Sequence, residues 1–430
     1  MGSEWRETTL EEIASRDSHA FAMGPFGSNI KAENYRQSGV PVIRGTNLGE
    51  RGEAPFIADG FVFLDDDKAD SLASSSCSPG DLVFVAQGTV GKVGLVPSDS
   101  PYRRFVLSQN LMKVTLDLKQ ADPRFAFYFF RSSAGQHEIM SRVNPTGVPC
   151  ISKPLTSLRK FGIRLPTDVG EQRAIGQMLG ALDDKIELNR RLSQTLESMA
   201  RALFKSWFVD FDPVRARANG AEPCLPSHLD HLFPDSFEDT SGGIPAGWRR
   251  GVVADIADVC SGSRPDARIR ASSQEAKVPV WGGNGPMGYV DQALFDGPIL
   301  LTGRVGTLGS VFRITSPSWP SDNTLILKPK DEIGFEYAYL LLRDLDLTSL
   351  NRGSTQPLLT QSDLRAQPAL LPPRAILERF HDACRRLFER IDRSEAESLA
   401  LGSLRNTQIP VLMSGGQPID GSRSSSGEIL

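Results

Sequence analysis

The sequence predicts an α+β fold in which two similar globular domains are each followed by one long helix. Three observations support this prediction. A set of motifs occurs twice in the same order, and each copy consists of short β-branched runs separated by Gly, Pro, Asn and Asp turns, with one or two helical segments. After each copy comes a long stretch with apolar residues at helical spacing. With 430 residues, the chain is long enough for two or three domains with their own cores.

The repeat rests on six features, which together predict that the second domain copies the first. Each copy contains a G-x-x-G-x-x-G run that directly follows an apolar, β-rich segment. Such glycine-rich runs either bring the backbone close to a partner or simply reverse the chain between strands, and general turn statistics favour strand reversal. In chain order, the matched features are residues 5–6 and 248–249, 41–47 and 279–284, 88–94 and 303–309, 108–111 and 321–325, 125–130 and 335–342, and 144–149 and 351–357.

Two long amphipathic helices are expected after the two domains. The first stretch, residues 169–208, contains no proline, and charged residues lie opposite its apolar stripe. At 1.5 Å per residue, helices of this kind would be about 45–60 Å long. The apolar positions are Ile175, Met178, Leu179, Leu182, Ile186, Leu192, Leu196, Met199 and Leu203 in the first stretch, and Ile376, Phe380, Ala383, Leu387, Ile391 and Leu401 in the second.

These helices are expected to pair with each other in antiparallel fashion, as a coiled-coil-like spacer. A helix this long has too much apolar surface to stand alone and too little to build a core by itself. The alternative is that each helix packs only on its own domain. Residues 210–243, rich in Pro and Asp, are interpreted as an ordered linker, and the Gly/Ser-rich end, residues 409–430, as a disordered tail.

Composition excludes several classes of protein. The sequence has no apolar run of the roughly 18 residues needed to span a bilayer and no apolar signal-peptide core at its start, so a cytoplasmic protein without a membrane partner is expected. The five cysteines are scattered and form no Cys-x-x-Cys pair, which argues against a disulfide framework and a zinc site. The net charge of −4 argues against nucleic-acid binding through bulk positive charge, so any DNA affinity must come from local patches or partners.

One segment carries a specific family resemblance. Residues 202–214 (ALFKSWFVDFDPV) closely resemble the central conserved region of type I restriction-modification specificity subunits. Residues 170–175 (GEQRAI), 182–187 (LDDKIE) and 244–249 (IPAGWR) look like the same family. The resemblance covers the chain from about residue 4 to about residue 410. The second helix departs from the pattern, because it begins with residues 374–379 (RAILER) and lacks a clear Glu-Gln-Arg start.

The resemblance implies a domain organisation. Residues 1–165 would form the first target-recognition domain and residues 244–372 the second. Residues 166–209 would form the central conserved spacer helix and residues 373–408 the distal one, with the ordered linker 210–243 and the tail 409–430 as above. In the family, each domain reads one half of a bipartite, gapped double-stranded DNA target, and the helices fix the unread gap. Two rigid readers on one spacer lead to the same geometry on physical grounds.

The resemblance also implies partners and the absence of catalysis in this chain. Methyltransferase and restriction subunits would bind it and carry the chemistry, so S-adenosylmethionine, ATP and Mg²⁺ are expected in those subunits and no cofactor here. The partner subunits would supply much of the phosphate affinity that the near-neutral charge leaves out. Docking of these subunits is expected on the helices, at Gln172, Arg173, Asp183, Lys185, Phe204, Trp207 and Phe208.

Contacts with DNA are expected from polar and basic residues on the equivalent loops of the two copies. Arg grips guanine, and Asn or Gln grips adenine, with two hydrogen bonds each. For each residue the alternative is a solvated loop side chain or a turn-stabilising amide. The candidates are Arg44, Asn47, Lys92, Gln109, Asn110 and Thr146 in the first copy, and Asn284, Arg304, Asn323, Thr355 and Gln356 in the second.

Two further hypotheses compete with DNA recognition. Asp266, Glu275 and Lys277 match a loose nuclease pattern that would hold Mg²⁺, although they lie in a polar stretch and the first copy has no counterpart. A scaffold that assembles methyltransferases without reading DNA is the other. His228 and His231 near Cys224 lack a fourth metal ligand, so no metal site is expected there. With no P-loop and no methyltransferase Asn-Pro-Pro-Tyr motif, the sequence offers no catalytic site.

Overall fold

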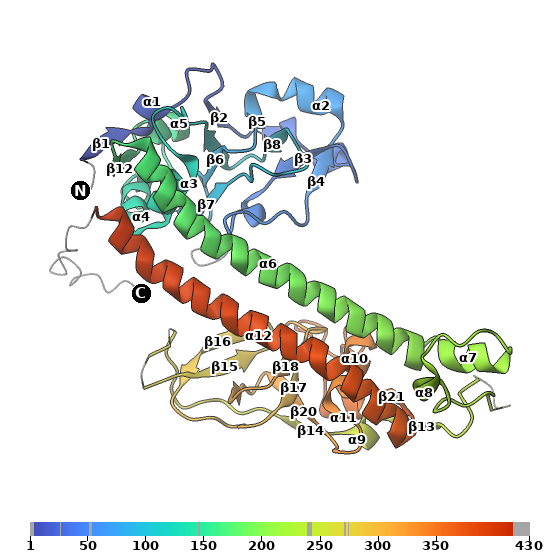
Figure 1. Ribbon diagram of the computed structural model, residues 1–430. Helices are drawn as coiled ribbons and strands as arrows, with labels where there is room; N and C mark the ends of the chain where they lie inside the picture. The colour runs from blue at the N-terminus through green and yellow to red at the C-terminus, as the bar shows by residue number, and fades with distance from the viewer. Residues whose placement is uncertain are drawn as a thin grey trace. The chain divides into compact units, whose positions relative to one another are not determined.

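The computed structural model describes residues 4–25, 27–50, 54–144, 147–238, 243–270, 272–273 and 275–415 (Figure 1). The chain divides into two compact units. Unit 1 comprises Met1–Arg191 and Ser394–Leu430, and unit 2 comprises Leu192–Arg393. Each unit therefore contains one globular domain together with part of each long helix. Within the described ranges, no helix is both long and apolar enough to cross a membrane.

Unit 1 is built on two four-stranded sheets and two short strand pairs. The first sheet is antiparallel, whereas β3 and β8 of the second sheet are parallel. The first has the order β2 (Phe21–Met23), β9 (Leu111–Val114), β6 (Leu82–Val85), β7 (Val93–Leu95), and the second β4 (Val62–Leu64), β3 (Val40–Ile43), β8 (Phe105–Leu107), β5 (Ser76–Cys77). The pairs are β1 (Trp5–Thr9) with β12 (Gly162–Pro166), and β10 (Val143–Asn144) with β11 (Cys150–Ile151).

Four short helices of unit 1 pack on the first sheet, whereas a fifth packs on the second. The aromatic segment forms α3 (Pro123–Arg131), which begins where the Asp122 carboxylate accepts a hydrogen bond from the Phe125 amide and Pro123 occupies the first turn. Its ring Phe130 packs edge-on against Phe84 of β6, with ring centroids 5.2 Å apart, so the aromatic run is core. The others on the first sheet are α1 (Leu10–Ile13), α4 (Ser133–Met140) and α5 (Pro154–Arg159), whereas α2 (Asp66–Ser71) packs on the second. The short 3₁₀ turns are η1 (Gly27–Asn29), η2 (Ala32–Asn34), η3 (Gly45–Asn47) and η4 (Ala73–Ser75).

Unit 2 repeats the strand order of unit 1. Its antiparallel sheet is β14 (Ala257–Ser261), β20 (Thr324–Pro329), β17 (Ile299–Gly303), β18 (Val311–Ile314), and its second sheet is β16 (Gly285–Val290), β15 (Val278–Gly282), β19 (Trp319–Pro320), again with a parallel pair, β15 and β19. β13 (Arg249–Val252) pairs with β21 (Pro368–Leu371) as β1 does with β12. The helices are α7 (Asp212–Ala218), α8 (Ser227–Asp230), α9 (Val253–Ile256), α10 (Phe335–Asp344) and α11 (Gln361–Arg365). The expected internal repeat is thus a repeat of topology.

The two long helices are α6 (Val169–Phe208) and α12 (Arg374–Met413), and they pair in antiparallel fashion. In unit 1, Lys185 of α6 pairs with Glu397 of α12 (3.4 Å), whereas Asn189, one turn further along α6, donates to the Ser394 carbonyl (3.3 Å), closer to the start of α12. The helices also pack on the domains, since Leu179 of α6 belongs to the unit 1 core. The expected fold class, α+β with two similar domains and two long antiparallel helices, is confirmed.

The end of α12 differs from the expectation. A tail was expected from residue 409, but the helix continues to Met413 even though Pro410 lies inside it. Ile409 and Met413 are buried in the unit 1 core, and burial of these two side chains stabilises the last turn. Residues 416–430 of the expected tail lie outside the described residues.

Candidate nucleic-acid interface

One four-residue turn occupies the same place in both units. We call it the edge turn: residues 108–111 (SQNL) after β8 in unit 1, and residues 321–324 (SDNT) after β19 in unit 2. In each copy the amide of the fourth residue donates to the carbonyl of the first, at 3.1 Å from Leu111 to Ser108 and 3.1 Å from Thr324 to Ser321. The side chains of the second and third positions are exposed or half-buried. Each edge turn is a closed β-turn that presents two side chains.

Matching hydrogen bonds hold both edge turns to the sheets. A carbonyl at the end of the preceding parallel strand accepts from the first turn residue, and the third and fourth turn residues each accept from a neighbouring segment. Donor to acceptor, these bonds are Ser108 to Ile43 (2.9 Å), Ala86 to Asn110 (2.8 Å) and Gly24 to Leu111 (2.8 Å) in unit 1, and Ser321 to Trp281 (2.9 Å), Arg304 to Asn323 (2.8 Å) and Gly262 to Thr324 (3.2 Å) in unit 2. The backbone therefore has the same frame in the two units.

The glycine-rich runs form the hairpin connections β6–β7 and β17–β18, as the turn interpretation predicted. The sequence match that paired Gly88 with Gly303 is displaced by three residues. The Gly88 amide donates to the Pro149 carbonyl (2.9 Å), and its counterpart is the Gly306 amide, which donates to Pro357 (2.9 Å), not Gly303. Gly88 and Gly306 both have positive φ, 91° and 84°. Glycines recur every three residues in this run, so a sequence match slides by one step unless backbone pairing fixes it.

Four loops thus meet at one end of each unit, which we call the polar edge. In unit 1 a pocket of about 290 Å³ lies between these loops. Hydrogen-bonding side chains of Tyr35, Arg44, Gln87, Thr89, Gln109 and Asn110 line it. The polar edge consists of residues 43–47, 86–92, 108–111 and 147–150 in unit 1, and residues 281–284, 304–309, 321–324 and 355–358 in unit 2.

The structure brings three of the candidate residues of unit 1 together. Arg44, Gln109 and Asn110 all line this pocket, and the last two are exposed. The Arg44 Nη2 donates to the Gly60 carbonyl (2.5 Å), so the guanidinium is oriented by the protein. Lys92 forms an ion pair with Glu50 (3.2 Å). Thr146, the remaining loop candidate, lies outside the described residues.

The prediction that Asn47 contacts DNA is wrong, because its side chain is completely buried. Its Oδ1 accepts from the Arg44 amide (2.9 Å), and its Nδ2 donates to the carbonyls of Ile57 (2.9 Å) and Asp59 (3.1 Å). These bonds use the amide group to hold the loop after β3. Asn47 therefore has the turn-stabilising role that the sequence analysis kept as the alternative to a DNA contact.

All five candidates of unit 2 lie on its polar edge. Asn284, Asn323, Thr355 and Gln356 are exposed, and Arg304 is half-buried. The loop that carries Thr355 and Gln356 is held beside the hairpin by the bond from Gly306 to Pro357, and the Arg304 carbonyl accepts from Leu359 (2.8 Å). Residues from four separate segments thus converge on this edge.

The sequence analysis missed a basic segment of unit 2. Residues 263–278 fill the interval between Gly262 and Pro279, as residues 25–40 fill the interval between Gly24 and Pro41 in unit 1. We call these segments arm 2 and arm 1. Arm 2 carries four exposed basic residues, Arg264, Arg268, Arg270 and Lys277. The equal spacing between the flanking Gly and Pro residues was the signal that could have identified the arms.

Asp322, the second residue of the unit 2 edge turn, was also missed. It occupies the place of Gln109 in unit 1, and the match of Ser108 and Asn110 with Ser321 and Asn323 already placed the two in register. The Arg264 Nε lies 3.9 Å from its Oδ2. The candidates were restricted to polar and basic residues of the equivalent loops, so this carboxylate was not among them.

The predicted docking residues in unit 1 mostly serve the chain itself. Gln172 is fully buried: its Oε1 accepts from the Asp122 amide (2.9 Å), and its Nε2 donates to the Gln120 (3.2 Å) and Pro166 (2.8 Å) carbonyls. These bonds tie the start of α6 to α3 and β12. The prediction that Gln172 docks a partner subunit is therefore wrong, because its amide group forms hydrogen bonds inside the unit.

The predicted docking role of Asp183 is also wrong, because this residue lies in a buried polar triad. Its carboxylate pairs with Arg405 of α12, and the side chains of both residues are 3% exposed. The Tyr128 hydroxyl of α3 donates to the other carboxylate oxygen (2.5 Å). Burial, and next the nearby Asp183 charge, raise the pKa of Tyr128. Of the other two expected docking residues here, Arg173 is exposed and Lys185 is half-buried.

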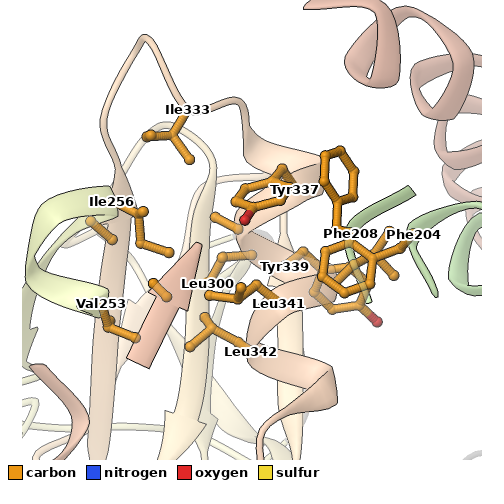
Figure 2. Packing of buried hydrophobic residues seen from close by; sticks show 14 of the residues in the cluster. Phe204, Phe208, Val253, Ile256, Leu300, Ile333, Tyr337, Tyr339, Leu341 and Leu342 are labelled. Atoms are coloured by element: carbon orange, nitrogen blue, oxygen red, sulfur yellow. The ribbon is translucent and has the colours of Figure 1, made fainter. Parts of the chain in front are cut away.

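The prediction that Phe204, Trp207 and Phe208 dock partner subunits is also wrong, because all three are buried in the unit 2 core. Figure 2 shows Phe204 and Phe208 beside Tyr337. Phe208 packs on Phe380 of α12 and on Tyr337 of α10, with both pairs of ring centroids 4.9 Å apart. The segment that carries the family resemblance is therefore the hydrophobic attachment of the end of α6 to unit 2. An aromatic-rich segment on an amphipathic helix is explained by internal packing alone.

The residues of the nuclease and linker metal hypotheses lie at the surface. Asp266, Glu275 and Lys277 are exposed, as are Cys224 and His231. Among the described residues, no three His, Cys, Asp or Glu side chains are placed to share a metal ion. Neither the nuclease nor the linker metal hypothesis gains a ligand set.

Comparison with known proteins agrees with this architecture. The family model described as type I restriction modification DNA specificity domain matches residues 34–198 and 245–388, once in each repeat. The chain is 23% identical to the type I restriction enzyme HindI specificity subunit of Haemophilus influenzae, over 96% of this chain and 99% of that one. It is also 23% identical to the MjaIX specificity subunit of Methanocaldococcus jannaschii, over 80% of both chains.

A crystal structure has the same fold. The S subunit of a type I restriction-modification system from M. genitalium superimposes with a TM-score of 0.57 at 17% identity, over 97% of both chains. The family model covers well over half of the chain, and the curated relatives are named specificity subunits. The chain therefore belongs to the family of type I restriction-modification specificity subunits, the non-catalytic, DNA-recognising components of those systems.

Proposed function

We propose that this chain reads a bipartite, gapped DNA target, with the polar edge of each unit reading one half. The observation that carries the proposal is the repeated polar edge: two units hold the same turn with the same hydrogen bonds and present different polar side chains on it. Two copies of one reader imply two half-sites, just as two copies of a DNA-binding monomer do in a dimeric repressor.

The pattern of rigid backbone and exposed polar side chains fits base recognition. Hydrogen bonds to base edges specify sequence, and they need donors and acceptors held in fixed positions. Arg44, Gln109 and Asn110 provide such groups in unit 1, and Asn284, Asn323 and Gln356 in unit 2. Contacts to phosphates would come from basic residues such as those of arm 2.

The helices α6 and α12 would set the number of unread base pairs between the half-sites. They would also dock the methyltransferase and restriction subunits, which would bind S-adenosylmethionine, ATP and Mg²⁺. The assembled complex would act in the cytoplasm. Because several predicted docking residues are buried, exposed side chains of the two helices are better candidates for these contacts. In unit 1 these are Arg173, Met178, Leu188, Leu399, Leu404 and Val411. A partner subunit that covered these apolar side chains would remove their surface from water, which favours binding.

An exchange of the first domain tests the proposal. Residues 1–165 would be replaced by the corresponding domain of another specificity subunit, and methylated bases would be mapped in cells that carry the chain with its methyltransferase. We expect a split motif in which only one half changes. A change in both halves would contradict the assignment of one half-site to each unit, and methylation without any motif would favour the scaffold hypothesis.

A further inference from the structure

Because the chain contains an internal repeat, the side chains at equivalent positions of the two units can be compared. At the edge turn the first position is Ser in both units and the third is Asn in both. The second position differs, with Gln109 in unit 1 and Asp322 in unit 2. Shared residues serve what the two copies have in common, and a difference on an identical backbone is where two half-sites can differ.

The backbone at this position is held tightly. In both units the amide of the fourth turn residue donates a hydrogen bond to the carbonyl of the first, at 3.1 Å, and three further backbone hydrogen bonds fix the turn to the sheets. In unit 2 the Thr324 hydroxyl adds a bond to the Ser321 carbonyl (2.7 Å). A side chain carried by such a frame reaches a fixed place with little loss of conformational freedom, which is what discrimination between bases needs.

The two side chains have different hydrogen-bonding chemistry. An ionised carboxylate only accepts hydrogen bonds, whereas an amide both donates and accepts. In the major groove, the base donors are the exocyclic amino groups of cytosine and adenine, and adenine alone shows a neighbouring acceptor and donor that a Gln amide matches. Asp322 and Gln109 therefore suit different bases.

The environment of Asp322 leaves this acceptor available. Arg264 lies 3.9 Å from Oδ2 and is itself 83% exposed, so the contact is a loose one at the surface. Within the described residues, Oδ1 has no hydrogen-bond partner. The nearby positive charge of Arg264 reduces the repulsion between this carboxylate and DNA phosphates in part.

We propose that the second position of the edge turn is a specificity-determining position. Asp322 requires an exocyclic amino group, of cytosine or adenine, at one base pair of the second half-site, and Gln109 selects adenine at one base pair of the first. This inference rests on the proposed bipartite reading and goes beyond it by naming the residues and the base chemistry.

The test maps methylated motifs in cells that carry the full chain with the methyltransferase of its system. In Asp322→Ala, which removes the acceptor, preference at one position of the second half falls from about tenfold or more to about threefold or less. The first half stays unchanged. The matched control is Asp296→Ala, at another exposed carboxylate of unit 2, which precedes the opposite end of β17 from the polar edge; it leaves both halves unchanged.

The reciprocal variant, Gln109→Asp, lies in the other unit and keeps the proposal testable by itself. We expect it to admit cytosine at one position of the first half and to leave the second half as it was. A split motif that both variants leave intact overturns this inference alone. A wild-type motif that is not split overturns the proposed function and this inference with it.

Discussion

The same two helices are attached to the two units by different chemistry. In unit 1, α6 and α12 are held by buried polar groups in addition to the apolar packing of Leu179, Ile409 and Met413. The polar groups are Gln172, the triad of Asp183, Arg405 and Tyr128, and Asn189. Asn189 is 1% exposed and donates to the Ser394 carbonyl and to Glu397 Oε2 (2.8 Å).

In unit 2 the same attachment is aromatic. Phe204, Trp207 and Phe208 of α6 pack around Phe380 of α12 and Tyr337 of α10, with ring centroids 4.9–6.2 Å apart. Aromatic contacts contribute large apolar area and tolerate small shifts, whereas a buried charge pair is satisfied in only one register. The comparison teaches that the aromatic attachment contributes mainly stability and the polar one mainly the alignment of the helices.

The largest expected effect comes from breaking the polar attachment. Asp183→Ala leaves the Arg405 guanidinium buried without its carboxylate, so the free energy of unfolding of unit 1 should fall by about 3–5 kcal/mol. Urea denaturation measures this change. The control, Lys185→Ala, removes a half-exposed pair with Glu397 and should cost at most about 1 kcal/mol. Equal losses in the two variants would contradict the assignment.

An apolar replacement of the triad separates alignment from stability. Asp183→Leu combined with Arg405→Met and Tyr128→Phe leaves neither a buried charge nor an unpaired buried hydroxyl, so most of the stability should return. If the polar groups serve alignment, the triple variant should recover its urea midpoint but methylate sites with more than one gap length. A single gap length in a stable triple variant would show that packing alone sets the alignment.

Within the aromatic attachment, the next effect is a single hydrogen bond. Tyr337→Phe removes the bond from the buried hydroxyl to the Leu370 carbonyl (2.6 Å) and keeps the ring, so we expect a loss of about 1–2 kcal/mol in the free energy of unfolding. Thermal denaturation measures it. Tyr339→Phe is the matched control, because its partner Glu197 is partly exposed (3.1 Å) and the loss should be smaller. A larger loss in the control would refute this ranking.

The arms should differ in their contribution to DNA affinity. Arg268, Arg270 and Lys277 of arm 2 have no ion pair within the described residues, whereas Lys31 and Arg36 of arm 1 pair with Glu33 (3.6 Å) and Asp65 (3.1 Å).

Replacing the three arm 2 residues by Ala should weaken binding of the assembled complex to its DNA by about fivefold, or about 1 kcal/mol. The salt dependence of log K should also become shallower by about 0.9 for each phosphate group that the arm no longer neutralises. Lys31→Ala with Arg36→Ala should change both less. Titrations at several salt concentrations measure these values, and an equal effect of the two arms would refute the difference.

The smallest effect is a pH dependence that appears only in base. Burial, and next the charge of Glu336, raise the pKa of Cys384 in unit 2 to about 12. Burial also raises the pKa of Cys77 in unit 1. An unfolded thiol ionises near pH 9, so its ionisation should leave stability unchanged below that pH and lower it above, where only the unfolded state loses the proton.

Urea denaturation at several pH values on both sides of pH 9 checks this. Thiol alkylation at pH 8 reports on the unfolding of each unit separately. Cys224 and Cys260 are exposed and should react in the native protein, whereas Cys77 and Cys384 should react only when their unit unfolds. In Asp183→Ala, Cys77 should become reactive at lower urea than Cys384. Simultaneous reaction of both would show that the two units unfold together.

Much of the fold could be predicted because it depends on local patterns. Helical spacing predicted α6 and α12, and the repeated motifs predicted two units of one topology. The polar edge was predicted in part: the loops of Gln109, Asn110, Asn323 and Gln356 do meet there. Arm 2 and Asp322 were missed, because a polar, charged segment has no period that separates a functional surface from a solvated one.

The sequence by itself determined the two-fold repeat, the α+β class and the two long helices, because periodicity and turn residues act over short stretches of chain. Only the tertiary structure decided which polar residues face inward and which glycines correspond. Gln172 and Asp183 look like surface residues of a helix until Asp122 and Arg405, 50 and 222 residues away, are placed beside them. A side chain's exposure is set by such distant neighbours, and no local pattern encodes them.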